Sequence, residues 1–180
     1  MSVADLDLVV RGPRIGVDVG TVRVGLAASD PDGLIATPVA TLPRGGGDLE
    51  TIVGEVRERG ARTVYVGLPR HLSGAEGASA GGARAYAVTL AQRVAPVQVR
   101  LVDERMSTVS AHRALRASGR PGRKHRSVVD QAAAVVILQD ALDAERATGR
   151  HPGELVGADP LEGAHGGHAD RPDDSGVTDW

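Results

Sequence analysis

Alternation of apolar and small residues near the N-terminus predicts a β-hairpin that carries an acid. Between residues 14 and 20, Ile15, Val17 and Val19 alternate with two glycines and Asp18. A period of two places the apolar side chains on one face of a strand and Asp18 on the other. Because glycines flank Asp18, a metal ion or a phosphate can approach its carboxylate over bare backbone. Taken alone, the stretch also fits a polar strand end with a bulge.

The rest of the hydrophobic pattern predicts alternating strands and helices. We expect strands at 22–28, 34–41, 63–68 and 97–102, and helices at 48–60, 79–94, 107–117 and 127–146. The β-branched run at 63–68 is typical of a buried central strand, and Pro38 places 34–41 at a sheet edge. The stripe expected to face the sheet from the last helix is Val128, Ala132, Val135, Val136 and Leu142. This order predicts an α/β protein with a mixed sheet and helices on both faces.

Charge divides the 180 residues into a basic body and an acidic tail. The formal net charge is −2, but residues 151–180 hold seven acids and one arginine, a net of −6, so residues 1–150 carry +4. We expect a lead-in at 1–12, one folded domain at 13–148, and a disordered acidic tail at 149–180. A basic body favours a polyanionic partner.

Composition excludes several classes of protein. The chain has no cysteine, which excludes a disulfide framework and a thiolate metal site. It has no apolar run of the roughly 18 residues that a membrane span needs, and its acidic N-terminus is unlike a signal peptide. We therefore expect a soluble cytoplasmic protein with no membrane partner. The chain has only three aromatic residues, which are too few for a surface on which successive bases stack.

Carboxylates from distant parts of the chain are expected at one edge of the sheet. Asp18 lies in the first strand, Asp103 and Glu104 end the last strand, and Asp130 is expected in the first turn of the last helix. Ligands of open α/β sheets usually bind at the carboxyl ends of the parallel strands. Clustered carboxylates repel unless a cation neutralises them. Oxygen ligands without cysteine favour Mg²⁺ or Mn²⁺, and one or two such ions can assist phosphodiester hydrolysis.

Each of these acids also has a structural interpretation. Ser127 and Asp130 are spaced as in a capping box, in which the acid satisfies the backbone at a helix start. Asp103 and Glu104 are adjacent, so in an extended strand they face opposite sides and only one can easily be a ligand. The strand phase does not decide between them, because Asp103 shares a face with apolar residues.

A basic segment without acids, residues 112–126, precedes Asp130. The side chains in and near it that we expect to bind phosphates are Arg105, Arg113, Arg116, Arg120, Arg123, Lys124 and Arg126. We place those after Arg116 in a loop. Charge without stacking residues favours structured nucleic acid bound through its backbone. Arg70 and His71 follow the strand at 63–68 and could contact the substrate at the same edge, with His71 as a possible general base.

Four stretches together resemble the YqgF/RuvX family of RNase H-like nucleases, which is related to the RuvC resolvases. They are GVDVGTVRVGLAASD, VGLPRHLSG, VDERMSTVSA and SVVDQAAAVVILQDALD, in the family's order between about 14 and 146. The resemblance implies an RNase H-like fold with five strands in the order 3-2-1-4-5 and a metal-dependent nuclease centre. It implies that Asp18, Glu104 and Asp130 are catalytic acids and metal ligands, with Asp103 as the alternate for Glu104. It also implies trimming of the 5′ end of the 16S rRNA precursor.

One position departs from the related resolvases. They carry an acid at the end of the fourth strand, where this chain has Gly67-Leu68-Pro69. The missing carboxylate would have to come from the fifth strand.

The sequence therefore predicts a metal-dependent phosphodiesterase that acts on structured nucleic acid, with RNA favoured over DNA, as a monomer or homodimer. One alternative is a Holliday-junction-resolving endonuclease, which needs a dimer because two symmetric cuts need two sites. Another is a nucleic-acid-binding protein without catalysis.

Overall fold

The computed structural model describes residues 7–71, 73, 75–104 and 123–157, with side chains in the last helix described from residue 131 on. The helix expected at 107–117 and the tail beyond 157 lie outside the described residues, as do Arg105, Arg113, Arg116 and Arg120. Within the described ranges, no helix is both long and apolar enough to cross a membrane.

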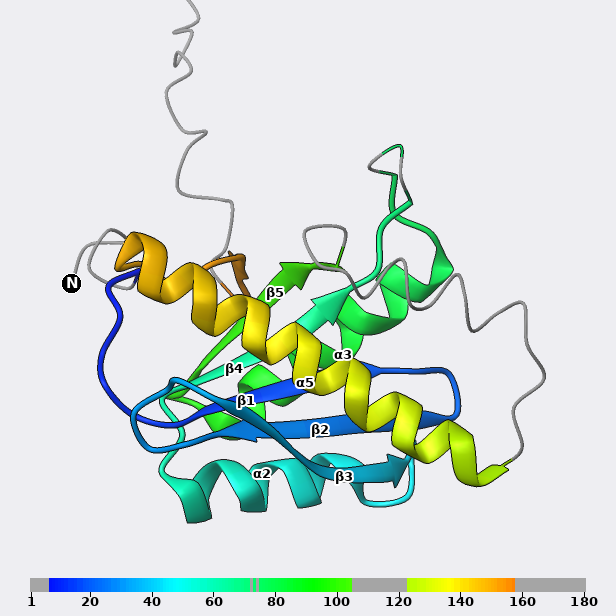
Figure 1. Cartoon of the computed structure of the whole chain (residues 1–180). Coiled ribbons are helices and arrows are strands. Elements are labelled where there is room, and N and C mark those ends of the chain that lie inside the picture. Colours follow the sequence, from blue (N-terminus) through cyan, green and yellow to red (C-terminus); the bar gives the residue numbers. More distant parts are fainter. Residues whose placement is uncertain (1–6, 72, 74, 105–122, 158–180) are drawn as a thin grey trace, which may run out of the picture.

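A mixed sheet with strand order β3-β2-β1-β4-β5-β6 forms the centre of the protein (Figure 1). The strands are β1 (Arg14–Val19), β2 (Arg23–Ser29), β3 (Ala36–Pro43), β4 (Thr63–Leu68), β5 (Gln98–Asp103) and β6 (Glu154–Leu155). The first three strands pair antiparallel, β4 and β5 run parallel to β1, and β6 returns antiparallel to β5. The expected order is confirmed, and β6 adds a sixth strand to the five expected.

Helices cover both faces of the sheet, as expected. The helices α2 (Asp48–Arg59) and α3 (Ala78–Val94) lie on one face, and α5 (Arg123–Thr148) crosses the other (Figure 1). The alternation of β1 decides which residues meet which layer. Ile15 and Val17 join the core under α2 and α3, whereas Gly16 lies directly against α5.

The face of α5 that packs on the sheet differs from the expected stripe. Its buried residues are Ala133, Ala134, Ile137, Leu138, Ala141, Leu142 and Glu145. Of the expected stripe, only Leu142 is among them; Ala132, Val135 and Val136 are half-buried. The alanines of this face allow the helix to approach the sheet closely, and Ile137, Leu138 and Leu142 fill the core between them.

The start of α5 also corrects the sequence analysis. The helix begins at Arg123, so Ser127 and Asp130 lie inside it and the capping-box interpretation is wrong. Arg123, Lys124 and Arg126, expected in a loop, belong to the helix as well.

Gly16 sets the distance between α5 and β1. A Cβ atom at this position would lie 2.7 Å from Cβ of Leu138 and 2.9 Å from the carbonyl oxygen of Ala134. The second contact is with helix backbone, which cannot rotate away as a flexible side chain can. A residue larger than glycine would therefore push α5 off the sheet.

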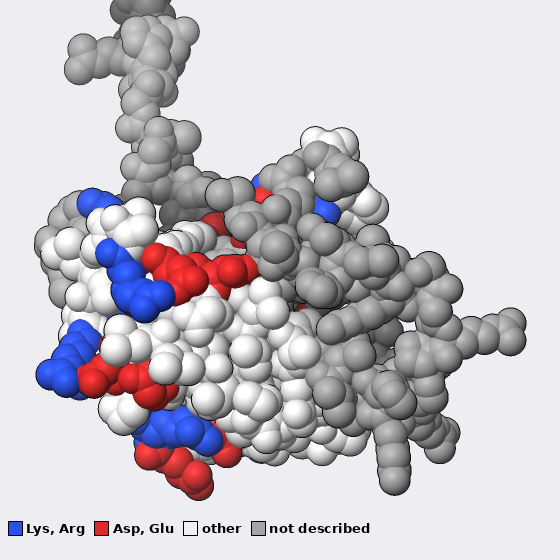
Figure 2. All heavy atoms as spheres, in the orientation of Figure 1, with Lys and Arg blue, Asp and Glu red and all other residues white. Residues whose placement is uncertain are grey.

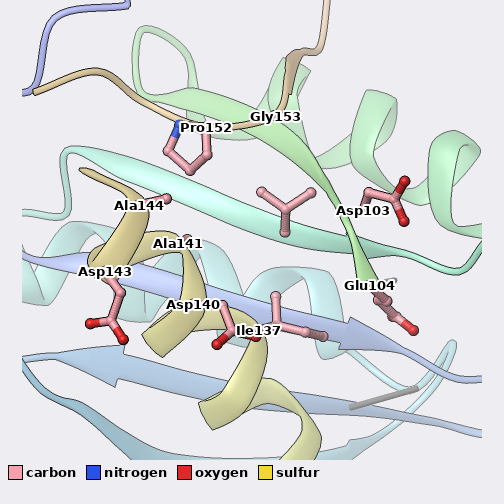
Figure 3. Close-up of a pocket in the computed structure, with 10 residues that line it drawn as sticks. Asp103, Glu104, Ile137, Asp140, Ala141, Asp143, Ala144, Pro152 and Gly153 are labelled. Carbon is pink, nitrogen blue, oxygen red and sulfur yellow. The ribbon is translucent and has the colours of Figure 1, made fainter. Parts of the chain in front are cut away.

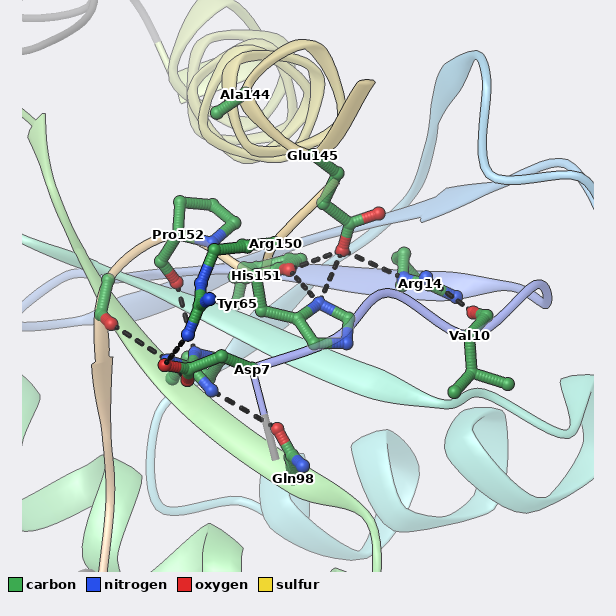
Figure 4. A network of polar contacts seen from close by, with 12 residues as sticks. Asp7, Val10, Arg14, Tyr65, Gln98, Ala144, Glu145, Arg150, His151 and Pro152 are labelled. Carbon is green, nitrogen blue, oxygen red and sulfur yellow. Dashed lines mark hydrogen bonds and ion pairs between the residues drawn. The ribbon is translucent and has the colours of Figure 1, made fainter. Parts of the chain in front are cut away.

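Two segments placed outside the domain by the sequence belong to the fold. We expected a lead-in up to residue 12 and a disordered tail from 149, but β6 pairs with β5 and His151 is buried. The backbone N–H of His151 donates to the carbonyl of Asp7 over 2.7 Å. The Asp7 carboxylate forms ion pairs with Arg100 at 2.8 Å and Arg150 at 3.2 Å (Figure 4). A two-residue strand has no hydrophobic period, so the sequence carries no signal for it.

A buried polar cluster joins the last turns of α5 to this segment. Glu145 Oε1 lies 3.0 Å from Arg14 Nε and 2.7 Å from His151 Nδ1, and it accepts a hydrogen bond from the Tyr65 hydroxyl (Figure 4). Burial alone disfavours the charged carboxylate. The hydrogen bonds from His151, Arg14 and Tyr65 outweigh burial and hold the pKa of Glu145 below its usual range. Burial and the neighbouring carboxylate raise the pKa of Tyr65.

We expect Gly16→Ala to lower the free energy of unfolding by about 1–3 kcal/mol, because the added methyl group overpacks the contact with α5. Urea denaturation measures this change. The matched control is Gly54→Ala in α2, where an added Cβ meets nothing within 4 Å. This control should be neutral or should stabilise the helix by up to about 1 kcal/mol. Equal effects of the two substitutions would contradict the role given to Gly16.

We expect Glu145→Gln to destabilise the protein at pH 7 by about 3 kcal/mol, because it leaves the buried Arg14 without its charged partner. The folded-state pKa of Glu145 is lowered, so its contribution is complete above the ordinary pKa of 4.5 and is lost as pH falls through the folded-state value. The difference in urea stability between wild type and variant should therefore shrink below about pH 4.5. A difference that stays constant down to pH 2 would refute this assignment.

Candidate active site

Asp18 is buried near the carboxyl end of β1, on the face that α5 covers. Asp18 comes two residues after Gly16, so its side chain points to the same face of the strand as the side-chain position of Gly16, the face against α5. Gly25 of β2 is its partner on one side. On the other side, the pairing of Val17 with Val66 brings Gly67 of β4 next to Asp18. Because both partners are glycines, neither neighbouring strand places a side chain of its own beside the carboxylate.

The structure separates the two adjacent acids at the end of β5. Asp103 and Glu104 point in different directions (Figure 3). Asp103 shares the face of Leu101, which packs in the core under α2 and α3. Glu104 is buried on the α5 face, which is the face of Asp18. The sequence left open whether Asp103 or Glu104 accompanies Asp18. Because α5 covers the face that carries both Glu104 and Asp18, the structure favours Glu104.

Glu104 reaches across the sheet to β4. A Cβ atom on Gly67 would lie 2.6 Å from Glu104 Oε1 and 2.6 Å from Cδ1 of Ile137 in α5. The carboxylate of Glu104 thus fills the space where a side chain at position 67 would begin. Glu104, just after β5, thus brings a carboxylate to the end of β4, where this chain has no acid of its own.

A cavity of about 370 Å³ opens beside Glu104, between α5 and the loop before β6 (Figure 3). Ile137, Ala141 and Ala144 form its wall on the α5 side, and Pro152 lies opposite. The acids that line it are Asp103, Glu104, Asp140 and Asp143. The buried carboxylate of Glu104 therefore adjoins a space that is open to solvent.

Asp130 can be placed from the backbone of α5. Glu145 contacts Arg14 at the start of β1, whereas the carbonyl of Ala134 lies over Gly16, so α5 runs opposite to β1. Asp130 precedes Ala134 by about one turn, or roughly 6 Å, and β1 advances by about 7 Å from Gly16 to Asp18. Asp130 therefore lies in the helix on the side toward the carboxyl end of β1, and its side chain lies outside the described atoms.

No group of three or more His, Asp or Glu side chains that could hold a metal ion occurs among the described side chains. The third expected ligand, Asp130, is outside that set. The structure thus places two of the expected acids, Asp18 in β1 and Glu104 just after β5, on one face of the sheet, with β4 between them. Asp103 also lines the cavity, but its carboxylate points away from Glu104, toward Arg70 (Figure 3).

Arg70 is engaged by acids of the protein itself. Its guanidinium lies 3.1 Å from Glu76 and 3.9 Å from Asp103. Over the described part of the face seen in Figure 2, basic side chains lie beside acidic ones. The neighbouring His71 is exposed, and its Nε2 atom lies 2.8 Å from where a Cβ of Gly77 would be, so its ring packs on its own loop.

A chain of ion pairs at this edge was missed by sequence reasoning. It runs from Asp103 through Arg70, Glu76 and Arg84 to Glu154. The two hydrogen-bonded contacts of Arg84 are 2.8 Å each, and they lower the pKa of Glu76 and of Glu154. The chain ties the loop after β4 to the strand that carries Glu104. Its members come from four segments, the loop after β4, α3, β5 and β6, without regular spacing, so the sequence gives no signal for it.

Comparison with known proteins identifies the family. The RuvX family model, described as Holliday junction resolvase, matches residues 12–144. A protein of a Nocardioides species named "Putative pre-16S rRNA nuclease" is 59% identical over 150 residues, which cover 81% of this chain and 96% of that protein. A protein of the same name from Thermobifida fusca is 55% identical over 156 residues, covering 83% and 98%.

Solved structures support the fold. RuvC of T. thermophilus, in complex with a Holliday junction substrate, matches with a TM-score of 0.50 and 15% identity, over 78% of this chain and 99% of that chain. The expected RNase H-like fold is thereby confirmed. The family model covers most of the chain and the relatives match along nearly their whole length, so this chain is a member of the RuvX family.

Proposed function

We propose that this protein is a metal-dependent nuclease that trims the 5′ end of precursor 16S rRNA in the cytoplasm. The observation that carries the proposal is the juxtaposition of Asp18 and Glu104 on one sheet face beside Gly67. The name shared by relatives at 55–59% identity supports the substrate. When a phosphodiester is hydrolysed, negative charge on the reacting phosphate has to be neutralised. Two carboxylates are themselves negative and cannot neutralise it, so the reaction needs a cation.

The residues present fit a divalent cation. Asp18 and Glu104 offer buried carboxylate oxygens, the glycines beside them leave room, and no cysteine competes. We assign Asp18, Glu104 and Asp130 as ligands of one or two Mg²⁺ or Mn²⁺ ions. A bound ion supplies positive charge to the phosphate and lowers the pKa of a coordinated water. Burial between β1, β4 and α5 fixes the orientation of the two carboxylates before substrate arrives.

Basic residues near the site would bind the phosphates of a structured nucleic acid, with RNA preferred over DNA. Those at the start of α5 are Arg123, Lys124 and Arg126, and those that precede them are Arg105, Arg113, Arg116 and Arg120. Arg70 would have to exchange Glu76 and Asp103 for a phosphate, so we assign it a smaller contribution to affinity. The protein could act as a monomer on such a substrate.

A second candidate function is cleavage of four-way DNA junctions. The description of the matching family model and the RNase H-like fold favour it. It requires a homodimer, because symmetric cuts on two strands need two sites. The same carboxylates would serve both substrates, so the substrate has to be identified by direct comparison.

We expect the wild-type protein to cleave precursor 16S rRNA in the presence of Mn²⁺ or Mg²⁺, and to cleave it faster than a four-way DNA junction. Asp18→Asn should reduce cleavage about 100-fold or more, because it removes a carboxylate ligand of the proposed metal ion, which would supply positive charge to the reacting phosphate. A gel assay with both substrates, with and without metal, measures both effects. Faster cutting of the junction by a dimer would select the second function, and full activity of the Asp18 variant would refute the proposed centre.

We expect Glu104→Gln to lower cleavage to the same extent as Asp18→Asn, and Asp103→Asn to retain most of the activity. The reason is that Glu104 shares the face of Asp18, while the carboxylate of Asp103 points away from Glu104 and contacts Arg70. The two substitutions are neighbours and change the charge equally, so each controls for the other. The reverse ranking in single-turnover rates would assign the ligand role to Asp103.

A further inference from the structure

A second cavity lies at the opposite end of the parallel strands, between the last turns of α2 and α3. Its volume is about 370 Å³, and Val53, Val56 and Val97 contribute apolar walls. Three arginines from different segments line it: Arg57 of α2, Arg62 just before β4, and Arg93 of α3. None of the described residues of the candidate active site lines this cavity.

The positive charges of two of these arginines are not paired with any acid in the described part of the protein. Among the described residues, the side chains of Arg57 and Arg62 make no hydrogen bond or ion pair, and both are exposed. Every other arginine whose side chain is described has a polar or electrostatic partner. Over the part of the chain that the structure describes, the fold therefore leaves two arginines without a polar partner, and both residues line one cavity, where the side chain of Arg62 also packs against Gly12. Arg57 lies near the C-terminus of α2, where the helix dipole stabilises a positive charge. Arg62 lies outside the helix, so the dipole does not account for its charge.

The chemistry of this cavity suits a phosphate. Planar guanidinium groups bind phosphate oxygens in pairs, and the apolar walls can take the sugar that follows. We propose that this cavity binds a backbone phosphate of the RNA substrate at a contact remote from the cleavage site. This inference rests on the proposed function for the identity of the nucleic acid.

The position of the cavity limits the substrates that can use it. Arg62 precedes β4, and Gly67, beside the candidate site, follows five residues later, about 16 Å along the strand. The arginines lie on the α2 and α3 side, whereas Asp18 and Glu104 face α5. A short oligonucleotide at the active site does not span this distance around the sheet. A large folded RNA does, so the contact would favour structured precursors.

The experiment measures how RNA affinity depends on salt, with the full-length chain and without divalent ions. Each phosphate contact contributes about 0.7–0.9 to the slope of log K against log salt concentration. Arg57→Ala/Arg62→Ala should lower that slope by about 0.7–0.9 for a precursor rRNA fragment, because one phosphate contact is lost, and should weaken binding. Arg57→Lys/Arg62→Lys should restore most of the slope. The matched control is Arg11→Ala/Arg59→Ala, which removes the same charge from residues already paired with Asp32 and Glu55.

Equal slopes for the alanine variant and the control would overturn the inference. Loss of inorganic phosphate or AMP binding in the variant, without a change in the RNA slope, would also overturn it and assign the cavity to a small anion. For a short oligonucleotide, we expect the alanine variant to have the wild-type slope. The readout does not need cleavage. A wild-type protein that cuts no RNA would disprove the proposed function and leave the slope measurement intact.

Discussion

The close contact between α5 and β1 at Gly16 is the constraint on which the rest of this structure depends. Because glycine lets the helix backbone approach the strand, α5 packs closely on the sheet face that also carries Asp18, two residues further along β1. Ile137 of the same helix limits the region over Gly67 in which Glu104 lies. The helix that completes the core is therefore also the element that selects the functional face of the sheet.

Much of the fold was accessible from the sequence because its strands have clear periods. The alternation around Asp18 predicted its face, and the hairpin followed by helix–strand repeats predicted the sheet order. The orientation of α5 was not accessible, because alanine and valine alternate around that helix without a dominant apolar side. Segments such as β6 are too short for any period, and the buried His151 gives no local sign of its partner Glu145.

The candidate site was predictable in its residue types but not in its geometry. Motif resemblance singled out Asp18, Glu104 and Asp130, yet periodicity could not choose between Asp103 and Glu104, since either face of β5 could have carried the site. Only the three-dimensional position of α5 distinguishes them. Arg70 shows the opposite case, because its charge suggested a free phosphate ligand while the fold surrounds it with acids from distant segments.

The pairing of Asp7 with residues 150 and 151 has a consequence for the connectivity of the chain. Leu8 forms a β-bridge with Arg150, so both ends of the described fold lie side by side. Chain ends that lie this close can be joined by a short linker, and new ends can be opened in an exposed loop elsewhere. The architecture is therefore suited to circular permutation. A permuted chain would need to retain the contacts of Asp7 with Arg100 and Arg150 across the new joint.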